Sequence, residues 1–473
     1  MAGTFIIGEK KVRPGAYFNV TKKDEGITPD IISGVVGVAF KADFGPLGVV
    51  TELSASEGYE KVFGTGGTTD AIKEAFNGGA ITVFGVRIGN GGTQANVKLK
   101  NTAEGAIDCV SITANYPGSK PFSVTVKEKL TDNTVKQCII YSGTTEFEKI
   151  EFDAGEGEVG NLINAFQQSD NFTAQLCTGA TVAMQLADVS QKAFTAGTDP
   201  TTTTSDYSDA FTQLEPYEMN ALCVDTNDTA VHLLMYSYIT RVYEAGQFII
   251  GVVAETNNVA LATRLEHART YNDYRMVYVV NAHCAEGSVE IDGYQTAARI
   301  AGMVAAVPAN KSLTHTTLNG VSRLIDKMTN SNIVKAEQSG CLVLSVNADK
   351  QVWIDSAINT LVTPDDDHDN GWKKIRRTKT RFELMRRVNI IADSLVGKVD
   401  NDDNGRKTIL AQILSVGTAM ISESKILQMN AYEDPDFVSD GDEVYFRIDV
   451  VDKDSAEHIY LRYQFQFSSI ISE

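Results

Sequence analysis

The chain has 473 residues, of which 43% are hydrophobic and 22% are charged. This length exceeds what one hydrophobic core usually organises, so we expect about two to four domains. The composition is that of ordinary folded proteins and excludes wholesale disorder and fibrous repeats. With 42 Lys and Arg against 61 Asp and Glu, the net charge is −19. A charge of this sign repels a phosphate backbone, which excludes nucleic acid as an expected partner.

No apolar run reaches the roughly 18 residues that crossing a bilayer requires. The N-terminus also lacks a basic segment followed by an apolar core and a cleavage site. We therefore expect neither export by a signal peptide nor insertion into a membrane. The cysteines form no C-x-x-C pair, and mostly apolar neighbours make them typical of reduced core residues in a cytoplasmic protein. They are Cys109, Cys138, Cys177, Cys223, Cys284 and Cys341.

Residues 1–22 predict an extended arm rather than a helix. Thr4-Phe5-Ile6-Ile7 and Tyr17-Phe18 are short apolar pieces, separated by charged residues and a Pro14-Gly15 turn. Such pieces need a sheet to join.

Residues 23–92 alternate between strand and helix signals, which predicts a first α/β segment. We expect strands at Val35 to Ala39 and Ile81 to Ile88, and a helix from Asp70 to Asn77 that Gly78 ends. Ser54 and Glu57 predict a capping box at the start of another helix.

Residues 93–196 predict an inserted β-rich domain, because short β segments follow one another between Gly, Asn and Asp turns. One helix, near Val159 to Gln168, interrupts it. The expected strands are Ala106 to Ala114, Ser123 to Lys127, Gln137 to Tyr141 and Phe147 to Phe152. Ala196 to Ser205 predicts a linker, because it has no periodic apolar face.

Residues 197–355 return to alternating helices and strands, which predicts a second α/β segment built on a parallel or mixed sheet. The expected helices are Val231 to Tyr243, Val259 to Tyr271 and Tyr294 to Val304. The expected strands are Phe248 to Val253, Met276 to Val280 and Cys341 to Val346.

Residues 356–458 predict an α+β C-terminal domain with helices around Arg381 to Val396 and Arg406 to Lys425. Residues 459–473 predict a final strand, because apolar and polar side chains alternate along it. Its apolar face consists of Ile459, Leu461, Tyr463, Phe465 and Phe467. This strand can pair with Val444 to Val451 of its own chain or with the sheet edge of a neighbouring molecule.

The sequence contains only weak matches to metal-binding, phosphate-binding and catalytic motifs. Asp400, Asp402, Asn404 and Gly405 match the opening of a calcium-binding loop, but Ala411 stands where a bidentate Glu is required, so we expect a solvated loop before a helix. The acidic run from Asp365 to Asn370 is typical of a hydrated turn. The Gly64 to Thr69 loop lacks the spacing and lysine of a phosphate-binding loop, and hydrolase and metalloprotease motifs are absent. We expect no catalytic residue, no metal and no cofactor.

Several ordered pieces across nearly the whole chain resemble the contractile tail sheath family of myophages, PBSX-like prophages and R-type bacteriocins. The pieces are Arg13-Pro14-Gly15-Ala16-Tyr17, Gly197-Thr198-Asp199 before Tyr207-Ser208-Asp209-Ala210, Ala298-Arg299-Ile300-Ala301-Gly302 followed by Pro308, Ser312 and Leu313, and Ile358-Asn359-Thr360-Leu361 leading to Trp372-Lys373-Lys374-Ile375-Arg376-Arg377. Each is short, but their order and spacing together are specific.

The resemblance implies a structural subunit of stacked hexameric rings around a tail tube, which contract and drive the tube through a bacterial envelope. The two α/β segments would form the sheath core, and residues 356–458 would be the inner domain. Implied partners are further copies of the chain, the tube protein, and the baseplate and tail terminator proteins, in a virion or bacteriocin tail assembled in the host cytoplasm. Both arms would add strands to neighbouring subunits through Phe5, Ile7, Val12, Tyr17, Val20, Ile459, Leu461, Tyr463, Phe465 and Phe467.

A basic run opposes the acidic character of the chain. It consists of Lys373, Lys374, Arg376, Arg377, Lys379, Arg381, Arg386 and Arg387. One interpretation is a solvated face balanced by the nearby acidic run. The other, which the family's inner domain suggests, is that Lys373 to Arg381 grip an acidic tube surface.

Two other classes remain open at this point. A cytoplasmic α/β enzyme with a β-rich accessory domain would need a pocket with converging polar groups. A surface layer would self-assemble as a sheath does, but the missing export signal argues against it.

Overall fold

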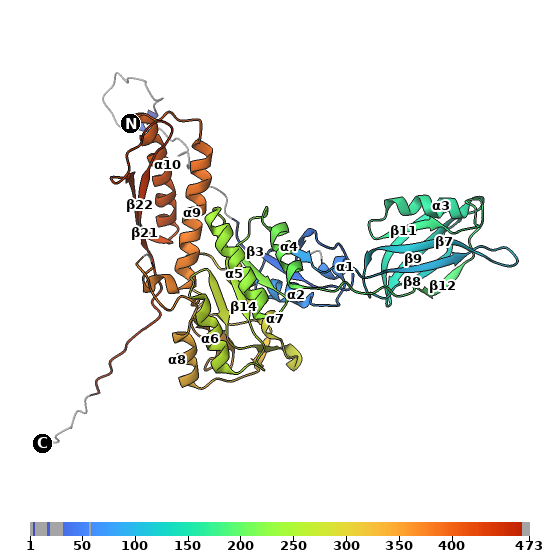
Figure 1. Cartoon of the computed structure of the whole chain (residues 1–473), viewed down its shortest axis with the longest axis horizontal. Coiled ribbons are helices and arrows are strands. Elements are labelled where there is room, and N and C mark those ends of the chain that lie inside the picture. Colours follow the sequence, from blue (N-terminus) through green and yellow to red (C-terminus); the bar gives the residue numbers. More distant parts are fainter. Residues whose placement is uncertain (1–2, 5–16, 19–31, 56–57, 367, 466–473) are drawn as a thin grey trace. The chain divides into compact units, whose positions relative to one another are not determined.

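The computed structural model covers residues 1–473 and describes all of them except 1–2, 5–16, 19–31, 56–57, 367 and 466–473 (Figure 1). The chain forms two compact units. The hairpin unit consists of Met1–Ile31 and Arg387–Asp452, and the main unit consists of Ile32–Arg386 and Lys453–Glu473. The boundary between the two units falls inside a helix, between Arg386 and Arg387. The domain bounds expected from the sequence, including a C-terminal domain from residue 356, stay a prediction.

A seven-stranded sheet organises the main unit, with the strand order β18-β15-β14-β13-β3-β5-β4. All neighbours in it are parallel except β4 and β5. The strands are β3 (Val35–Phe40), β4 (Val50–Ser54), β5 (Thr82–Arg87), β13 (Ala221–Val224), β14 (Ile250–Ala254), β15 (Met276–Val279) and β18 (Cys341–Leu342). Their nearly unbroken apolar runs suit strands that are buried on both faces, as in parallel sheets covered by helices.

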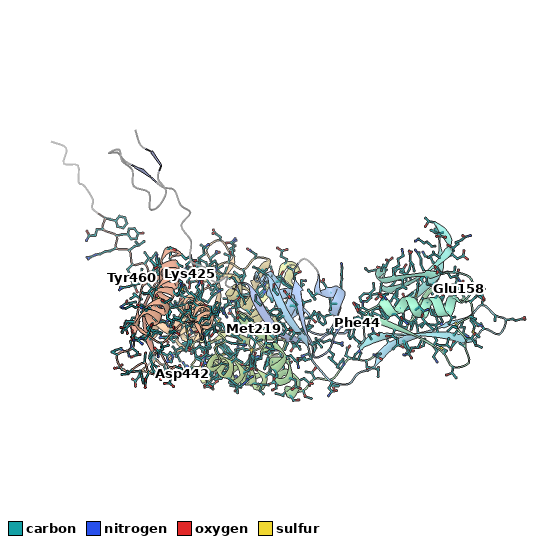
Figure 2. The ribbon with its side chains drawn as sticks, turned by 90° about the horizontal axis from the view of Figure 1, so that it is seen from above. Phe44, Glu158, Met219, Lys425, Asp442 and Tyr460 are labelled. Atoms are coloured by element: carbon teal, nitrogen blue, oxygen red, sulfur yellow. The ribbon has the colours of Figure 1, made fainter. Side chains whose placement is uncertain are left out.

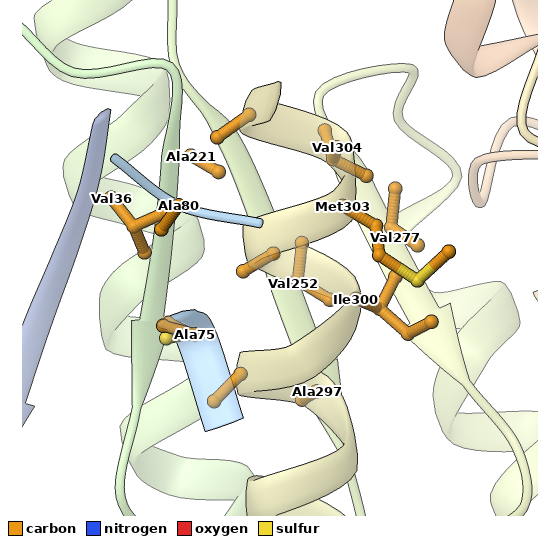
Figure 3. Close-up of a cluster of buried hydrophobic side chains, with 14 of the residues drawn as sticks. Val36, Ala75, Ala80, Ala221, Val252, Val277, Ala297, Ile300, Met303 and Val304 are labelled. Atoms are coloured by element: carbon orange, nitrogen blue, oxygen red, sulfur yellow. The ribbon is translucent and has the colours of Figure 1, made fainter. Parts of the chain in front are cut away.

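Two groups of helices supply the two covers. One group is α2 (Asp70–Asn77) and α7 (Gly293–Ala306), and the other is α4 (Thr204–Leu214), α5 (Thr229–Glu244) and α6 (Leu261–Tyr271). Figure 3 shows Ala297, Ile300 and Val304 of α7 facing the sheet residues Val252 and Val277. The predicted helices α2, α5, α6 and α7 are confirmed, with bounds shifted by a few residues at most, whereas α4 was not predicted.

Helices α2 and α7 cross closely because glycines lie at the contact, Gly302 within α7 and Gly78 at the C-terminal end of α2. A Cβ at Gly302 would lie 2.1 Å from the carbonyl oxygen of Ala75 and 3.1 Å from the Cα of Gly78. No side chain fits there, so any substitution at Gly302 must separate the helices.

Two short helices and two strand pairs complete the main unit outside the inserted domain. The helices are α1 (Tyr59–Phe63) and α8 (Asn330–Gln338), and the strand pairs are β16 (His283–Ala285) with β17 (Val321–Leu324) and β19 (Leu344–Val346) with β20 (Val352–Ile354).

Ser54 does not cap a helix as predicted, and Glu57, the other half of the predicted capping box, lies outside the described residues. Ser54 is the last residue of β4, and helix α1 begins at Tyr59 after Gly58, which makes no side-chain cap. The Ser-x-x-Glu spacing misled because residues that favour caps also end strands, and the pattern alone does not separate the two.

The inserted domain contains two antiparallel sheets, β10-β9-β8-β12 and β11-β7-β6. Their strands are β6 (Gln94–Lys100), β7 (Asp108–Pro117), β8 (Ser123–Lys129), β9 (Asp132–Ser142), β10 (Thr145–Asp153), β11 (Phe172–Leu176) and β12 (Val189–Ala193), and helix α3 (Glu158–Ala165) continues into the 3-10 turn Phe166–Gln168. They share a core that Phe44, from the main sheet's side, joins (Figure 2). The four predicted strands and the helix are present.

The predicted linker is not a bare tether. Thr195, Thr198 and Thr201 pair with Asn96, Thr93 and Asn90, so the chain leaves and re-enters the main sheet along two paired segments. Backbone hydrogen bonds need no apolar face, which is why the side-chain pattern gave no signal.

Arg87 fastens this double connection. Its fully buried guanidinium donates to the carbonyl oxygens of Ala42, Gly45 and Pro117 at 2.7–3.1 Å. Burial lowers the pKa of Arg87 to about 10, against the opposing charges of Asp199 and Asp43. Because Pro117 belongs to the inserted domain and Ala42 to the sheet side, one side chain ties the two together.

We expect Arg87→Met to lower the free energy of unfolding by roughly 2–5 kcal/mol, because it leaves buried carbonyl groups without donors. Urea unfolding followed by circular dichroism measures the change. Arg241→Met is the matched control, since Arg241 forms an exposed pair with Glu215 and should cost at most about 1 kcal/mol. Equal effects of the two variants would contradict the assigned role.

The C-terminal part holds α9 (Ile375–Leu395), α10 (Asp403–Ser422), and the antiparallel strands β21 (Ile426–Glu433) and β22 (Phe446–Asp452). Both predicted helices are present. Helix α10 packs on β21, with Gly417 lying against Met429 (Figure 1).

Two fully buried histidines sit in the main unit. His283 lies 3.8 Å from Glu74 and bonds to Thr296, and burial together with Arg299 lowers its pKa to about 3. Burial also lowers the pKa of His232. Both side chains are therefore neutral in the folded protein at neutral pH.

We expect acid to destabilise the main unit from about pH 6.5 downward. The unfolded chain binds a proton near pH 6.5 and folded His283 only near 3, so stability falls as pH falls between these values, by up to about 1.4 kcal/mol per unit for each histidine. Urea midpoints across this window should fall less steeply in His283→Gln than in the unchanged chain. The exposed His458→Gln is the control; a slope unchanged by His283→Gln would refute the assignment.

Candidate assembly interface

The C-terminal segment has an apolar face whose side chains are mostly exposed among the described residues. Ile459, Leu461, Tyr463 and Phe465 are 73%, 70%, 73% and 88% exposed, and residues 453–465 form no helix or strand. In Figure 2 the side chains around Tyr460 lie apart from any packed core. Phe467 lies outside the described residues.

The pairing of this segment with Val444 to Val451 in its own chain is wrong. Strand β22 pairs with β21, in a register from Ile426 opposite Asp452 to Glu433 opposite Phe446. Strand β21 begins shortly after α10 ends and pairs with β22 along its length, so the hairpin does not include the described residues after Asp452.

Strands β21 and β22 form a two-stranded sheet with no third strand among the described residues. Each strand therefore has one edge whose backbone N–H and C=O groups face no partner strand there. A two-stranded sheet is marginal by itself, and further strands would stabilise it. Exposed Phe437 and Val438 in the connecting loop add apolar surface to the same hairpin.

The N-terminal arm is described only at two short places. Gly3–Thr4 pairs in parallel with Tyr17–Phe18, which places Tyr17 in an extended strand as expected. Phe5, Ile7, Val12 and Val20 lie outside the described residues. Their role as intersubunit strands stays a prediction.

The basic run begins helix α9, and its charges are used inside the chain. Lys379 Nζ donates to the carbonyl oxygens of Val304, Ala305 and Val307, at the C-terminal end of α7. Cations are favoured there because the last carbonyl groups of a helix carry partial negative charge. The guanidinium of Arg381 lies 3.7 Å from the ring centre of Trp372.

The last two arginines of the run belong to different units, and each contacts its own unit. Arg386 donates to the carbonyl oxygen of Phe248 at 3.1 Å in the main unit. Arg387 makes a bidentate pair with Glu423, at 2.9 and 2.8 Å, in the hairpin unit. These contacts give the arginines structural roles that sequence proximity to acidic residues 365–369 did not indicate.

The beginning of the run holds the chain's own C-terminal segment. Lys374 Nζ lies 2.8 Å from Asp454 and 3.2 Å from Glu457, and Arg376 donates to Ser455 at 2.6 Å. Lys373 donates to the carbonyl oxygen of Glu337, and burial lowers its pKa. The acidic partners lie about eighty residues from the run, so no local sequence pattern indicates them.

The calcium-like loop is a helix cap. The side chain of Asp402 accepts a hydrogen bond from Gly405 N at 2.7 Å and starts α10. A Cβ at Gly405 would lie 1.8 Å from the carbonyl oxygen of Asp400, so glycine is required by close backbone approach. The expected loop before a helix is confirmed.

The main sheet reverses its strand order between β3 and β13, which is where open α/β sheets usually bind ligands. Here the place is filled by protein. The buried carboxylate of Asp225 forms an ion pair with Lys41 Nζ at 2.8 Å. It also accepts hydrogen bonds from the hydroxyl of Tyr207 at 2.5 Å and from the hydroxyl of Thr68 in the glycine-rich loop. Burial and the charge of Asp225 raise the pKa of Tyr207, so this hydroxyl stays protonated. The loop supports an ion pair.

A groove of about 350 Å³ lies between the end of α7 and residues 311–319. The charged groups that line it include Arg299 and Lys311. Arg299 is committed to Glu74 at 2.5 Å and to the carbonyl oxygen of Asn319, so its charge does not point into the groove as a binding group. This arrangement does not favour the enzyme alternative. Among the described helices, none has both the length and the apolar character to span a bilayer.

A family model described as the phage tail sheath protein central domain matches residues 201–360. Residues 201–360 are thus similar to the central domain of phage tail sheath proteins. This confirms the resemblance drawn from the sequence. The matched range contains the second half of the main sheet and helices α5, α6 and α7. It supports a structural role in a tail sheath rather than a catalytic one.

Similar proteins extend the likeness beyond this domain. The Bacillus subtilis (strain 168) protein "Uncharacterized protein YqbK" is 24% identical over 375 residues, which are 76% of this chain and 75% of that protein. The crystal structure of the sheath tail protein from Desulfitobacterium hafniense is 18% identical, with a TM-score of 0.70 over 93% of this chain and 100% of that one. The helical sheath of the anti-feeding prophage, in its contracted state, is 13% identical, with a TM-score of 0.54 over 96% and 99%. The expected mixed α/β multidomain fold is confirmed.

Proposed function

We propose that this chain is the subunit of a contractile tail sheath, which polymerises as stacked hexameric rings around a tail tube. Contraction of the rings would drive the tube through a bacterial envelope. The observation that supports this most is the exposed apolar face of residues 459–465 together with a two-stranded sheet that has open edges. The contracted anti-feeding prophage sheath has the same fold.

The donor and the acceptor are both in this chain. The C-terminal arm has an alternating apolar face that pairs with no strand among the described residues, and we propose that the β21–β22 hairpin accepts a strand at one of its edges. If the arm of one copy pairs with the hairpin of another, every subunit both gives and receives a strand. Such pairing uses backbone hydrogen bonds, which survive while the main units move past each other.

The remaining partners follow from the same role. The tube protein, a baseplate and a tail terminator would bound the polymer, in a phage or bacteriocin-like tail assembled in the bacterial cytoplasm. Lys373, Lys374, Arg376, Arg377, Lys379 and Arg381 stay a predicted contact to the tube. Because several of these side chains have structural partners, charge reversal there tests tube binding only if folding is checked.

We expect the apolar face of the arm to be required for polymerisation. Replacing Ile459, Leu461, Tyr463 and Phe465 by Ser should leave folded subunits that form no tubes, because the donated strand loses its buried face. Electron microscopy and sedimentation measure the polymer, and circular dichroism measures the fold.

The matched control replaces the opposite face of the same strand, Tyr460, Arg462 and Gln464, by Ser. It keeps the length and the backbone of the arm, so tubes should still form. Normal tubes from the first variant would contradict strand donation, and loss of tubes from both variants equally would show that face identity is irrelevant.

A further inference from the structure

The root of the C-terminal arm is bound in a built polar site, which we call the socket. The socket consists of Ser312, Thr314, Lys374 and Arg376, and its occupant is the segment Asp454-Ser455-Ala456-Glu457. Both belong to the main unit.

Glu457 is the centre of these contacts. One carboxylate oxygen accepts hydrogen bonds from Ser312 Oγ at 2.9 Å and Thr314 Oγ1 at 3.3 Å. The other oxygen lies 3.2 Å from Lys374 Nζ, and the side chain is only 11% exposed. Lys374 also reaches Asp454 at 2.8 Å, so one cation serves two carboxylates.

The walls of the socket are fixed by the main fold. Thr314 Oγ1 accepts a hydrogen bond from Ala357 N at 3.0 Å, and Ser312 Oγ accepts one from Thr314 N at 3.1 Å. Lys374 pairs with Ile358 through the backbone, and Arg376 is 6% exposed. Burial opposes the charge of Lys374, but the bonds and charges of Asp454 and Glu457 prevail and raise its pKa.

The contacts stop abruptly. Two residues after Glu457, Ile459 is 73% exposed, and the exposed apolar alternation begins there. On the other side, β22 of the hairpin unit ends at Asp452. The bound segment therefore separates the hairpin from the predicted donor strand.

We propose that the socket anchors the C-terminal arm to the main unit of its own chain and sets the point from which the strand leaves. This inference rests on the proposed function where it concerns strand donation. Only one residue separates Glu457 from Ile459, so an anchor at Glu457 restricts the start of the strand to a small volume. This restriction raises the effective concentration of the strand near the anchor. It also transfers a pull on the donated strand to the sheet-based main unit instead of to β22.

The test uses the free, full-length subunit and a glutamate-specific endopeptidase, because cleavage after Glu457 requires its side chain to leave the socket. We expect Lys374→Glu to speed this cleavage roughly tenfold, since it removes the shared cation and adds repulsion. Lys374→Glu combined with Asp454→Lys restores one cation among two carboxylates and should recover most of the protection. Lys311→Glu, an exposed charge reversal nearby, is the matched control.

Salt gives a second measurement. At about 1 M salt, where the Debye length is about 3 Å, cleavage of the unchanged chain should accelerate while Lys374→Glu changes little. Equal cleavage rates in the unchanged chain, Lys374→Glu and Lys311→Glu would overturn the socket, as would failure of the charge swap to restore protection in a folded protein.

Polymer assays keep the two proposals apart. If the unchanged chain forms tubes and Lys374→Glu forms them with severalfold lower yield, both proposals are supported. Tubes at full yield from Lys374→Glu would overturn the arm-setting role. If no condition yields tubes from the unchanged chain, the sheath proposal fails, while the cleavage rates still decide whether the socket exists.

Discussion

Burial of the parallel sheet on both faces is the constraint on which the rest of the main unit depends. It requires helices on each side, and α7 satisfies one side by packing small residues against the sheet and against α2. The close crossing at Gly302 sets how near α7 lies to α2. Lys379 then binds the last carbonyl groups of α7 and fixes the start of α9. The position of the socket residues Lys374 and Arg376 thus follows from sheet burial through two helices.

The basic run has a different meaning in the structure than in the sequence. Read along the chain, it is a patch of one sign in an acidic protein. In the fold its residues make separate structural contacts. Lys379 binds the C-terminal end of α7, and Lys374 binds Asp454 of the C-terminal segment. The consecutive arginines Arg386 and Arg387 each contact their own unit. In the sequence, a basic residue with a structural role looks the same as one that binds a partner. Both place a positive charge where the surroundings are negative.

The inserted domain is attached more firmly than its loop-like connections suggest. Paired backbone segments and the Arg87 fork hold it to the edge of the main sheet, and Phe44 crosses into its core. The inserted domain and the main sheet accordingly belong to the same compact unit.

The sequence by itself determined the elements with strong periodicity: helices α2, α5 and α7, the strands β3, β5, β14 and β15 of the main sheet, and the alternating face of residues 459–465. It also indicated, through Ala411, that the calcium-like stretch would be a loop before a helix. These are local properties, because hydrophobic period and missing ligands are visible within a few residues. Tertiary structure alone decided which strand pairs with β22, that the Thr-rich connection is paired, and that Lys374 binds Asp454 and Glu457. These contacts join residues far apart in the chain, and long-range pairing depends on the packing of the whole fold rather than on any local pattern.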